Sequence, residues 1–555
     1  MHRLIAASCV VVSTVFAIPP DLGRGRPGDV LHVHHAPDPV NVRTGNFYLP
    51  FQDYYQTCFT LPTEVYRSYN SFWTENGPFG KGWTFNFDTQ VKVNPEIGVQ
   101  VIEADGFINS YQPAESGKGS SGVIDRILKS KKDEDAKKSA RKSDAFYDEY
   151  KGKLQGDREF FKRQKAIYLP GENLLSPKGK YVSTERGRST IDQTRDGFTR
   201  VLETGRIEIF DKNGRLVRVE DRNRNSLRLA YNSDGRLARI TDSCDQSISF
   251  KFNKGGRIEK ITDTRGRAIS YAYDAGDFLV SMTPVDGQTM QYSYDNLGRM
   301  TSITFADKSS TKMVYDPKTS RVLKQIGPGT KITTYQYGKS GGMVWTSVED
   351  TQGEKSKYEY IDGEHKTIHT DRNGKKTITT HMACCGKPLS IKDESGKGDL
   401  FQYDADGNLI SRSNSSGQTT TFKYDPRFSL PSEIQDNTGK SIRYVYDQNG
   451  NITFTKASDG AFVKITYEPH GKIATMTDEA ENQIRFSYDK IGNPLAIEKL
   501  QKSKVLGSLK ISYGSSGDVS NVVAGPSGKE TVAAIKNTLS SMFNSLKPIG
   551  VEFSL

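Results

Sequence analysis

The sequence predicts an all-β fold, an antiparallel array of β-hairpins, on two observations. Between residues 210 and 517 one phrase returns every 21 or so residues: an aromatic residue, usually followed by Asp, with Gly four positions after the aromatic. A fixed period of this length indicates one supersecondary unit that is copied and stacked on its neighbours. The second observation is composition. Hydrophobic residues make up only 35% of 555 residues, which is low for one solid core and suits a sheet with one face in water.

The aromatic residues of the phrase share one phase of the repeat, so we expect them to stack as a ladder along one side of a continuous sheet. In one copy Met382 stands in the place of the ring. The other ladder positions are Phe210, Tyr231, Phe252, Tyr273, Tyr294, Tyr315, Tyr337, Tyr360, Tyr403, Tyr424, Tyr446, Tyr467, Tyr488 and Tyr513.

Each copy is predicted to be one β-hairpin. In the copy that starts at Tyr294, Asp295 and Gly298 have the spacing of a type I turn, which accepts Asp at its first position and favours Gly at its fourth. The run after this turn, 300–305, is rich in β-forming residues and partly alternates, as in a strand with one wet face. Fifteen copies therefore predict roughly thirty short strands.

Residues 1–17 are typical of a secretory signal peptide. Arg3 precedes an apolar run, and Ala17 ends a plausible small-residue cleavage site. No later stretch reaches the roughly 18 apolar residues of a membrane-spanning helix. We therefore expect a mature chain that starts near Ile18, has no transmembrane segment, and is secreted, periplasmic or at the cell surface.

Residues 18–115 are predicted to form an N-terminal β domain with aromatic residues in its core. Its glycine-rich turn over 77–82 carries Phe79 and leads into Trp83. Glycine permits the sharp backbone path that such a turn requires. We expect both rings to be structural.

Residues 116–166 are predicted to be a charged insertion, helical or partly disordered. The net charge of the chain is +11, and residues 126–165 alone hold fourteen Lys or Arg against eight Asp or Glu. Because this stretch holds no basic motif of the aromatic-interleaved kind that binds nucleic acid, we expect a solvated charged helix and no nucleic-acid partner. Residues 167–209 are predicted to be a β lead-in to the array, which occupies 210–517.

Residues 518–555 are predicted to form a helical cap. Ser527 and Glu530 have the spacing of a capping box at the start of a helix. We expect this helix to cover the open end of the array, where a strand edge would otherwise be unpaired. One apolar face of the predicted helix is formed by Val532, Ile535, Leu539, Met542 and Leu546.

The phrase Tyr294-Asp295 with Gly298 resembles the YD repeats of the Rhs (rearrangement hotspot) family, which is related to teneurins and to insecticidal toxin-complex subunits. Three earlier phrases, DPVNVRTGN, YRSYNS and GPFGKGW, resemble the N-terminal domain that precedes these repeats in Rhs proteins. The resemblance implies that the sheet winds as a spiral into a hollow shell. Rhs toxins carry a variable toxin domain after the repeats. We expect none here, because the sequence ends a few dozen residues after the last repeat.

The function that this resemblance implies is an exported, non-enzymatic shell scaffold that binds, encloses or displays an unidentified protein or glycan partner. Two alternatives stay open: a hydrolase that uses polar groups inside the shell, and a carbohydrate-binding or adhesion protein of the cell surface. The sequence indicates neither the oligomeric state nor the role of the insertion.

No catalytic, cofactor-binding or metal site is predicted. The Asp residues recur with the turns, and the H-E-x-x-H and G-x-S-x-G motifs are absent. His32 and His34 would share a strand face and could ligate a metal, but no further ligand is near, so we expect solvated histidines. His365 and His369 are expected to be ordinary strand residues, and His470 occupies a turn.

Four cysteines remain in the predicted mature chain. Cys384 and Cys385 are adjacent in a turn, and in an exported protein they either form a vicinal disulfide or stay as two buried thiols. Cys58 and Cys244 are the other two. The sequence leaves their pairing open.

Overall fold

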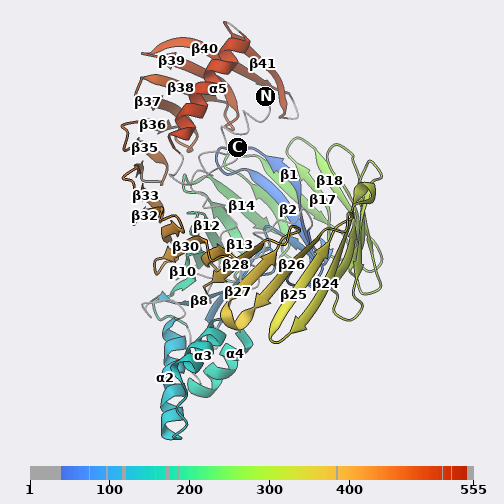
Figure 1. The fold of residues 1–555 in the computed structure, drawn as a ribbon. Coiled ribbons are helices and arrows are strands. Elements are labelled where there is room, and N and C mark those ends of the chain that lie inside the picture. The colour runs from blue at the N-terminus through green and yellow to red at the C-terminus, as the bar shows by residue number, and fades with distance from the viewer. Residues whose placement is uncertain are drawn as a thin grey trace.

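The computed structural model describes residues 39–546 except 74, 96–97, 115–120, 157, 171–174, 184–186, 383–385, 515–516 and 527. Antiparallel strands dominate this part of the chain (Figure 1). Thirty-six of them, β6 to β41, form one sheet whose strand order follows the chain. The predicted all-β antiparallel array is confirmed.

The sheet begins with eight strands that close on themselves. Val91 on β6 donates a backbone hydrogen bond of 2.9 Å to Gly214 in the turn before β13, and Gln90 bridges to Arg215. Inside this closed ring, buried Arg200 contacts the hydroxyl of Tyr111 at 2.7 Å. The ring strands are β6 Gln90–Asn94, β7 Gly98–Ile102, β8 Ile108–Pro113, β9 Lys180–Ser183, β10 Ser189–Thr194, β11 Gly197–Leu202, β12 Ile207–Asp211 and β13 Leu216–Glu220.

After the ring the sheet continues hairpin by hairpin. These strands are β14 Ser226–Tyr231, β15 Leu237–Thr241, β16 Ser247–Phe252, β17 Ile258–Asp263, β18 Ala268–Tyr273, β19 Leu279–Thr283, β20 Met290–Tyr294, β21 Met300–Thr304, β22 Ser310–Tyr315, β23 Val322–Ile326, β24 Ile332–Ser340, β25 Met343–Glu349, β26 Lys355–Ile361, β27 Lys366–Thr370, β28 Lys376–His381, β29 Pro388–Asp393, β30 Gly398–Tyr403, β31 Leu409–Asn414, β32 Thr419–Asp425, β33 Leu430–Asp436, β34 Ser441–Tyr446, β35 Ile452–Ala457, β36 Phe462–Tyr467, β37 Ile473–Asp478, β38 Asn482–Tyr488, β39 Pro494–Gln501, β40 Lys504–Tyr513 and β41 Val519–Gly525. Short 3-10 turns, η3 Pro328–Thr330 and η4 Asp362–Glu364, interrupt them.

The turn between β20 and β21 shows how local chemistry sets the hairpin. Gly298 has a φ of +76°, which favours glycine, and its N–H donates to the carbonyl of Asp295 at 2.9 Å. The Asp295 carboxylate accepts from the amides of Leu297 and Arg299 at 3.0 and 2.9 Å. The Asp side chain therefore satisfies the turn amides that the sheet leaves unpaired.

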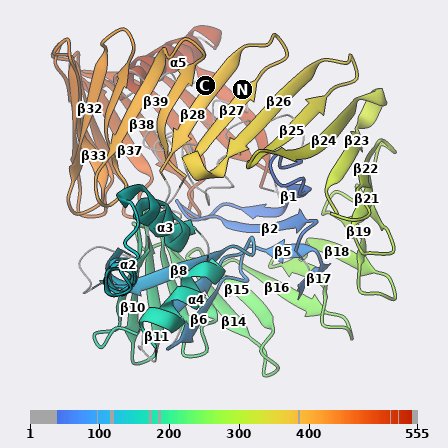
Figure 2. The ribbon, with the colours of Figure 1, turned by 60° about the horizontal axis from the view of Figure 1, so that its bottom comes forward.

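A second, three-stranded sheet lies inside the curve of the first. It consists of β1 Tyr48–Gln56, β2 Thr63–Asn70 and β5 Trp83–Phe85, in that order, next to a small hairpin of β3 Asn76–Gly77 and β4 Gly80–Lys81. In Figure 2 the strands β14 to β28 curve around β1, β2 and β5. We call the β1-β2-β5 sheet with its β3-β4 hairpin the plug.

Three helices fill the connection between β8 and β9: α2 Ser121–Lys137, α3 Asp144–Gly156 and α4 Arg158–Tyr168. They pack on one another around Ile127 and Leu154 and extend away from the strands (Figure 1). The predicted charged insertion is thus helical. Among the described residues, no helix is both long and apolar enough to cross a membrane.

The helix α5 Lys529–Asn544 lies across the face of β37 to β41 (Figure 1). The predicted capping box is wrong. Gly528 is the N-cap and makes no side-chain cap bond, so Glu530 stands two residues after it instead of the three that a box requires. Ser527 lies outside the described residues.

Candidate functional site: the inner face of the shell

The repeat tyrosines connect neighbouring hairpins through their hydroxyl groups. Tyr294 donates to the carbonyl of Leu279 at 2.8 Å, and Tyr424 donates to that of Leu409 at 2.7 Å. Each acceptor lies 15 residues earlier. The same bond, 2.5 to 3.0 Å long, is made by Tyr231, Tyr273, Tyr315, Tyr337, Tyr403, Tyr446, Tyr467 and Tyr488.

The rings point to the face of the sheet that meets the plug. Trp83 on β5 donates its indole N–H to the hydroxyl of Tyr294 at 3.0 Å. Phe79 lies edge-on to Tyr271, with ring centroids 5.0 Å apart. We call this face, which carries the repeat aromatics and the residues two and four positions before them, the inner face.

A buried ion pair fastens the plug to the inner face. Arg67 on β2 and Asp53 on β1 lie 2.6 Å apart with side chains 0% and 1% exposed. Arg67 donates to the hydroxyl of Tyr292 at 2.7 Å, and Tyr271 donates to Asp53 at 2.7 Å. Burial acts to lower the pKa of Arg67, but Asp53 and the two tyrosines outweigh it and raise that pKa above its ordinary value. The guanidinium is therefore a fixed cation within the core.

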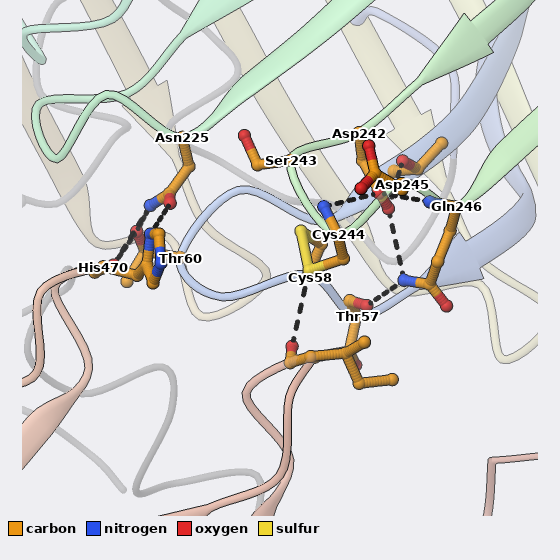
Figure 3. The surroundings of a disulfide bond; sticks show 12 residues. Thr57, Cys58, Thr60, Asn225, Asp242, Ser243, Cys244, Asp245, Gln246 and His470 are labelled. Carbon is orange, nitrogen blue, oxygen red and sulfur yellow. Dashed lines mark hydrogen bonds between the residues drawn. A yellow bond between two sulfur atoms is a disulfide. The ribbon is translucent and has the colours of Figure 1, made fainter.

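A disulfide joins the plug to the array. Cys58, after β1, is bonded to Cys244 in the turn between β15 and β16, 186 residues away (Figure 3). Gln246 of the same turn donates to the carbonyl of Thr57 at 2.9 Å. Burial raises the pKa of Asp242 beside this bond, although the amides of Gln246 and Cys244 donate to its carboxylate. Because both cysteines are in the disulfide, neither offers a thiolate to a metal.

At both ends of the array, other elements pack against the inner face through apolar side chains. Near its start it shares one hydrophobic cluster with Phe79 and Trp83 of the plug. Near its end it shares a second cluster with Ile535 and Leu539 of α5. The residues four positions before the aromatic are apolar in both places: Leu227, Ile248, Ile269 and Met290 in the first, Ile442, Val463, Ile484 and Leu509 in the second.

Between these ends the inner face belongs to neither hydrophobic cluster, although Phe401 and Leu409 are buried within it. Within the described part of the chain, no residue from 361 to 421 belongs to either cluster. The position four before the aromatic is here occupied by Thr377, Asp399 and Thr420. The three preceding repeats, which still belong to the first cluster, already carry Thr311, Thr333 and Ser356 at this position.

We call the inner face of β27 to β31 the open band. Arg412 on β31 stands opposite Phe401, at the position that Ile303 occupies opposite Tyr292. Its guanidinium contacts Asp399 at 2.9 Å, and these side chains are 42% and 26% exposed. The band therefore carries hydroxyl groups and a partly exposed ion pair beside the buried side chains of Phe401 and Leu409.

Comparison with protein families agrees with this architecture. The teneurin YD-shell family matches residues 199–327, and the RHS repeat family matches 403–428. Both matches fall within the array, so its repeats are similar to YD and RHS repeats, and we call the array the YD shell. A domain of unknown function, DUF6531, matches 37–111, which covers the plug, β6, β7 and the first residues of β8. No curated protein matches the chain.

Solved Tc toxin structures resemble the YD shell at low identity. A TcdB2-TccC3 structure without its hypervariable C-terminal region is 11% identical, with a TM-score of 0.39, over 64% of this chain and 22% of that chain. The Photorhabdus luminescens Tc holotoxin pore is 11% identical, with a TM-score of 0.33, over 88% of this chain and 32% of that chain. The chain thus spans under a third of their length.

One ladder position was assigned wrongly. His381, not Met382, occupies the aromatic position, because the strand register shifts at His381 opposite Pro388 as it shifts at Tyr403 opposite Leu409. The loop after His381 is one residue longer than the common turn, so Gly386 stands five positions after the ladder residue instead of four. His381 is buried and lies 3.2 Å from the Thr367 hydroxyl. Burial lowers its pKa to about 4.

Of the other histidines singled out in the sequence, His365 lies next to His381, whose backbone N–H donates to the His365 carbonyl at 2.8 Å. His369 stacks on Tyr358, and His470 stacks on Phe59 with ring centroids 3.8 Å apart. His365 follows η4 in a left-handed conformation. The positions predicted for Cys384-Cys385 and for His32 and His34 lie outside the described residues.

Sequence reasoning missed Arg67 and the open band. A single Arg in a β-rich run gives no sign that it will be buried with Asp53. The open band did leave a signal, since Thr or Asp replaces Ile at a fixed distance before successive aromatics.

Proposed function

We propose that this YD shell is an exported, non-enzymatic scaffold that holds a polar partner polypeptide against the open band. The observation that carries the proposal is the stretch of inner face outside both hydrophobic clusters, which bears hydroxyl groups and the partly exposed Asp399–Arg412 pair. If the sheet served only to form a closed shell, apolar side chains along the whole inner face would stabilise it further through burial. Hydroxyls and a partly exposed Asp399–Arg412 pair suit a hydrophilic guest.

The non-enzymatic part of the proposal is supported by the surroundings of the turn aspartates and the histidines. Turn aspartates are occupied by backbone amides, as at Asp295. Of the four described histidines of the array, His369 and His470 each stack on an aromatic ring, and His381 is buried beside the backbone of His365. Purified protein is expected to leave peptide, glycan and nucleic-acid substrates intact. Hydrolysis that one Asp, His or Ser substitution removes without unfolding would overturn this part.

The partner test is an affinity capture with matched variants. Tagged wild type, an open-band variant Thr379→Lys and an outer-face variant Ser411→Lys are recovered from the protein's own cells, and captured proteins are identified by mass spectrometry. The proposal expects a partner that wild type and Ser411→Lys retain and Thr379→Lys loses. Equal capture by all three would place the contact elsewhere.

Export is tested separately. N-terminal sequencing of the native protein is expected to start near Ile18, in material outside the cytoplasm. An intact Met1 in a cytoplasmic fraction would contradict it.

A further inference from the structure

Turns from distant parts of the array meet along a line that we call the seam. Asn451 donates to Asn223 at 2.8 Å, although the two lie 228 residues apart, and Arg188 pairs with Asp406 at 2.9 Å. These contacts join the turns next to β10 and β13 to those of β30 and β35. The seam is therefore where successive layers of the spiral touch.

A pocket of about 440 Å³ opens at the seam. One side comes from residues 188–224 and the other from residues 427–449. Its size falls in the range of small-molecule sites, which run from about 300 to 1,000 Å³. Its lining combines charge, amides and one ring, as in Glu203, Arg222, Arg224, Phe428, Gln448 and Asn449.

Arg222 is a half-buried cation in this pocket. One of its nitrogens donates to the carbonyl of Glu203 at 3.3 Å, and its guanidinium lies 5.9 Å from the centre of the Phe428 ring. No carboxylate of the described residues forms an ion pair with it. Burial lowers the pKa of Arg222, with Tyr446 opposing, but a guanidinium stays charged at neutral pH. A charge kept partly from water in this way is stabilised by an external anion.

Most other charges of the lining are already used. Arg427 holds Asp425 at 2.7 Å, and Glu220 holds Arg218 at 2.7 Å. Asp221 accepts from the amides of its own turn.

Glu203 is different, because no cation of the described chain pairs with it. The Glu203 carboxylate adds a negative charge to the lining of the pocket, which disfavours a bare inorganic anion. It accepts hydrogen bonds from hydroxyl groups, and Gln448 and Asn449 both donate and accept. The pocket thus favours a ligand that carries hydroxyls next to its anionic group.

We propose that the seam pocket binds one or two units of an acidic saccharide, with the sugar carboxylate on Arg222 and the hydroxyls on Glu203, Gln448 and Asn449. The planar guanidinium matches a carboxylate with two parallel hydrogen bonds. This site lies at the seam, away from the open band, and does not depend on the proposed function.

Calorimetric titration of the full chain tests the proposal with three probes: galacturonic acid oligomers, neutral maltotriose and sodium sulfate. Saturable binding is expected for the galacturonate oligomers, and weaker binding for the other two. Arg222→Gln should reduce that affinity at least about tenfold, as expected for loss of a charged hydrogen-bonding pair. Arg236→Gln is the matched control, because Arg236 also lies over an aromatic ring, Phe252, but outside the pocket.

Arg222→Lys keeps the positive charge but loses the planar guanidinium that makes two parallel hydrogen bonds. This variant should bind the galacturonate oligomers with intermediate affinity. This variant also decides the matter if Arg222→Gln unfolds. No binding of galacturonate oligomers, sulfate binding of equal strength, or unchanged affinity in both Arg222 variants would each overturn the proposal.

Discussion

The repeats around Tyr292 and those around Phe401 share one hairpin design but differ in what stands behind them. At Tyr292 the plug covers the inner face, and the buried Arg67–Asp53 pair lies there. At Phe401, which is also buried, the inner face shares a hydrophobic cluster with neither the plug nor α5, and the pair Asp399–Arg412 is partly exposed. The difference teaches that the turns and the ladder tyrosines are enough to form the sheet. The residue four positions before the aromatic varies with what packs against the inner face at that repeat.

The largest contrast is expected between the two ion pairs. Arg67→Ala leaves Asp53 buried without its partner, which should lower the free energy of unfolding by about 3–5 kcal/mol. Arg412→Ala should cost about 1 kcal/mol or less, because that pair is partly exposed. Denaturant unfolding followed by tryptophan fluorescence measures both. Equal losses would mean that the open band is as buried as the plug.

The disulfide ties only the plug side of the shell covalently, so its loss should affect the plug side more than the open band. Cys58→Ser removes a link that restricts the unfolded chain over 186 residues, and should cost about 2–4 kcal/mol. Limited proteolysis should then release fragments from the plug side before any from the open band. Cys244→Ser serves as the matched control, since it breaks the same link and should cost about as much.

Acid should weaken the middle of the array first. The pKa of His381 is about 4 when folded against an ordinary 6.5, so the unfolded chain binds more protons between these values. Stability should therefore fall as the pH drops from 6.5 towards 4, by on the order of 2–3 kcal/mol, and change no further from this source below pH 4. His381→Tyr, which restores the usual ladder residue, should lose less over this range. An identical pH profile for both proteins would contradict the assignment.

The smallest expected contrast concerns the ladder hydroxyls. Tyr294→Phe leaves the Leu279 carbonyl and the Trp83 indole N–H without their partner, at about 1–3 kcal/mol. Tyr424→Phe orphans one carbonyl in the less covered region, and about 1 kcal/mol is expected. Thermal unfolding of the two variants gives the comparison. A larger loss for Tyr424→Phe would show that the plug adds nothing to the ladder.

The repeat was predictable because its chemistry is local. Asp295 and Gly298 define their turn within four residues, so their spacing alone indicates the hairpin. The charged insertion and the apolar face of α5 have the same local character. His381 was misplaced by one residue because the longer loop moved the glycine on which the alignment relied.

Long-range features could not be predicted from one sequence. Nothing in the segment around Cys58 says that it will meet Cys244, or that Arg67 will meet Tyr292, because these contacts depend on how the spiral returns around the plug. The seam pocket belongs to the same class, since its two sides are separated by some two hundred residues of wall.

The ring that closes between β6 and β13 has a consequence for how the molecule is made. A chain synthesised from its N-terminus completes the plug and this ring before most of the array exists. Every later hairpin then adds to one advancing edge, whose unpaired strand is exposed only until the next hairpin arrives. The spiral sheet thus lengthens from a closed start. Duplicating or deleting one hairpin would change the length of the spiral and leave the β6–β13 ring closed.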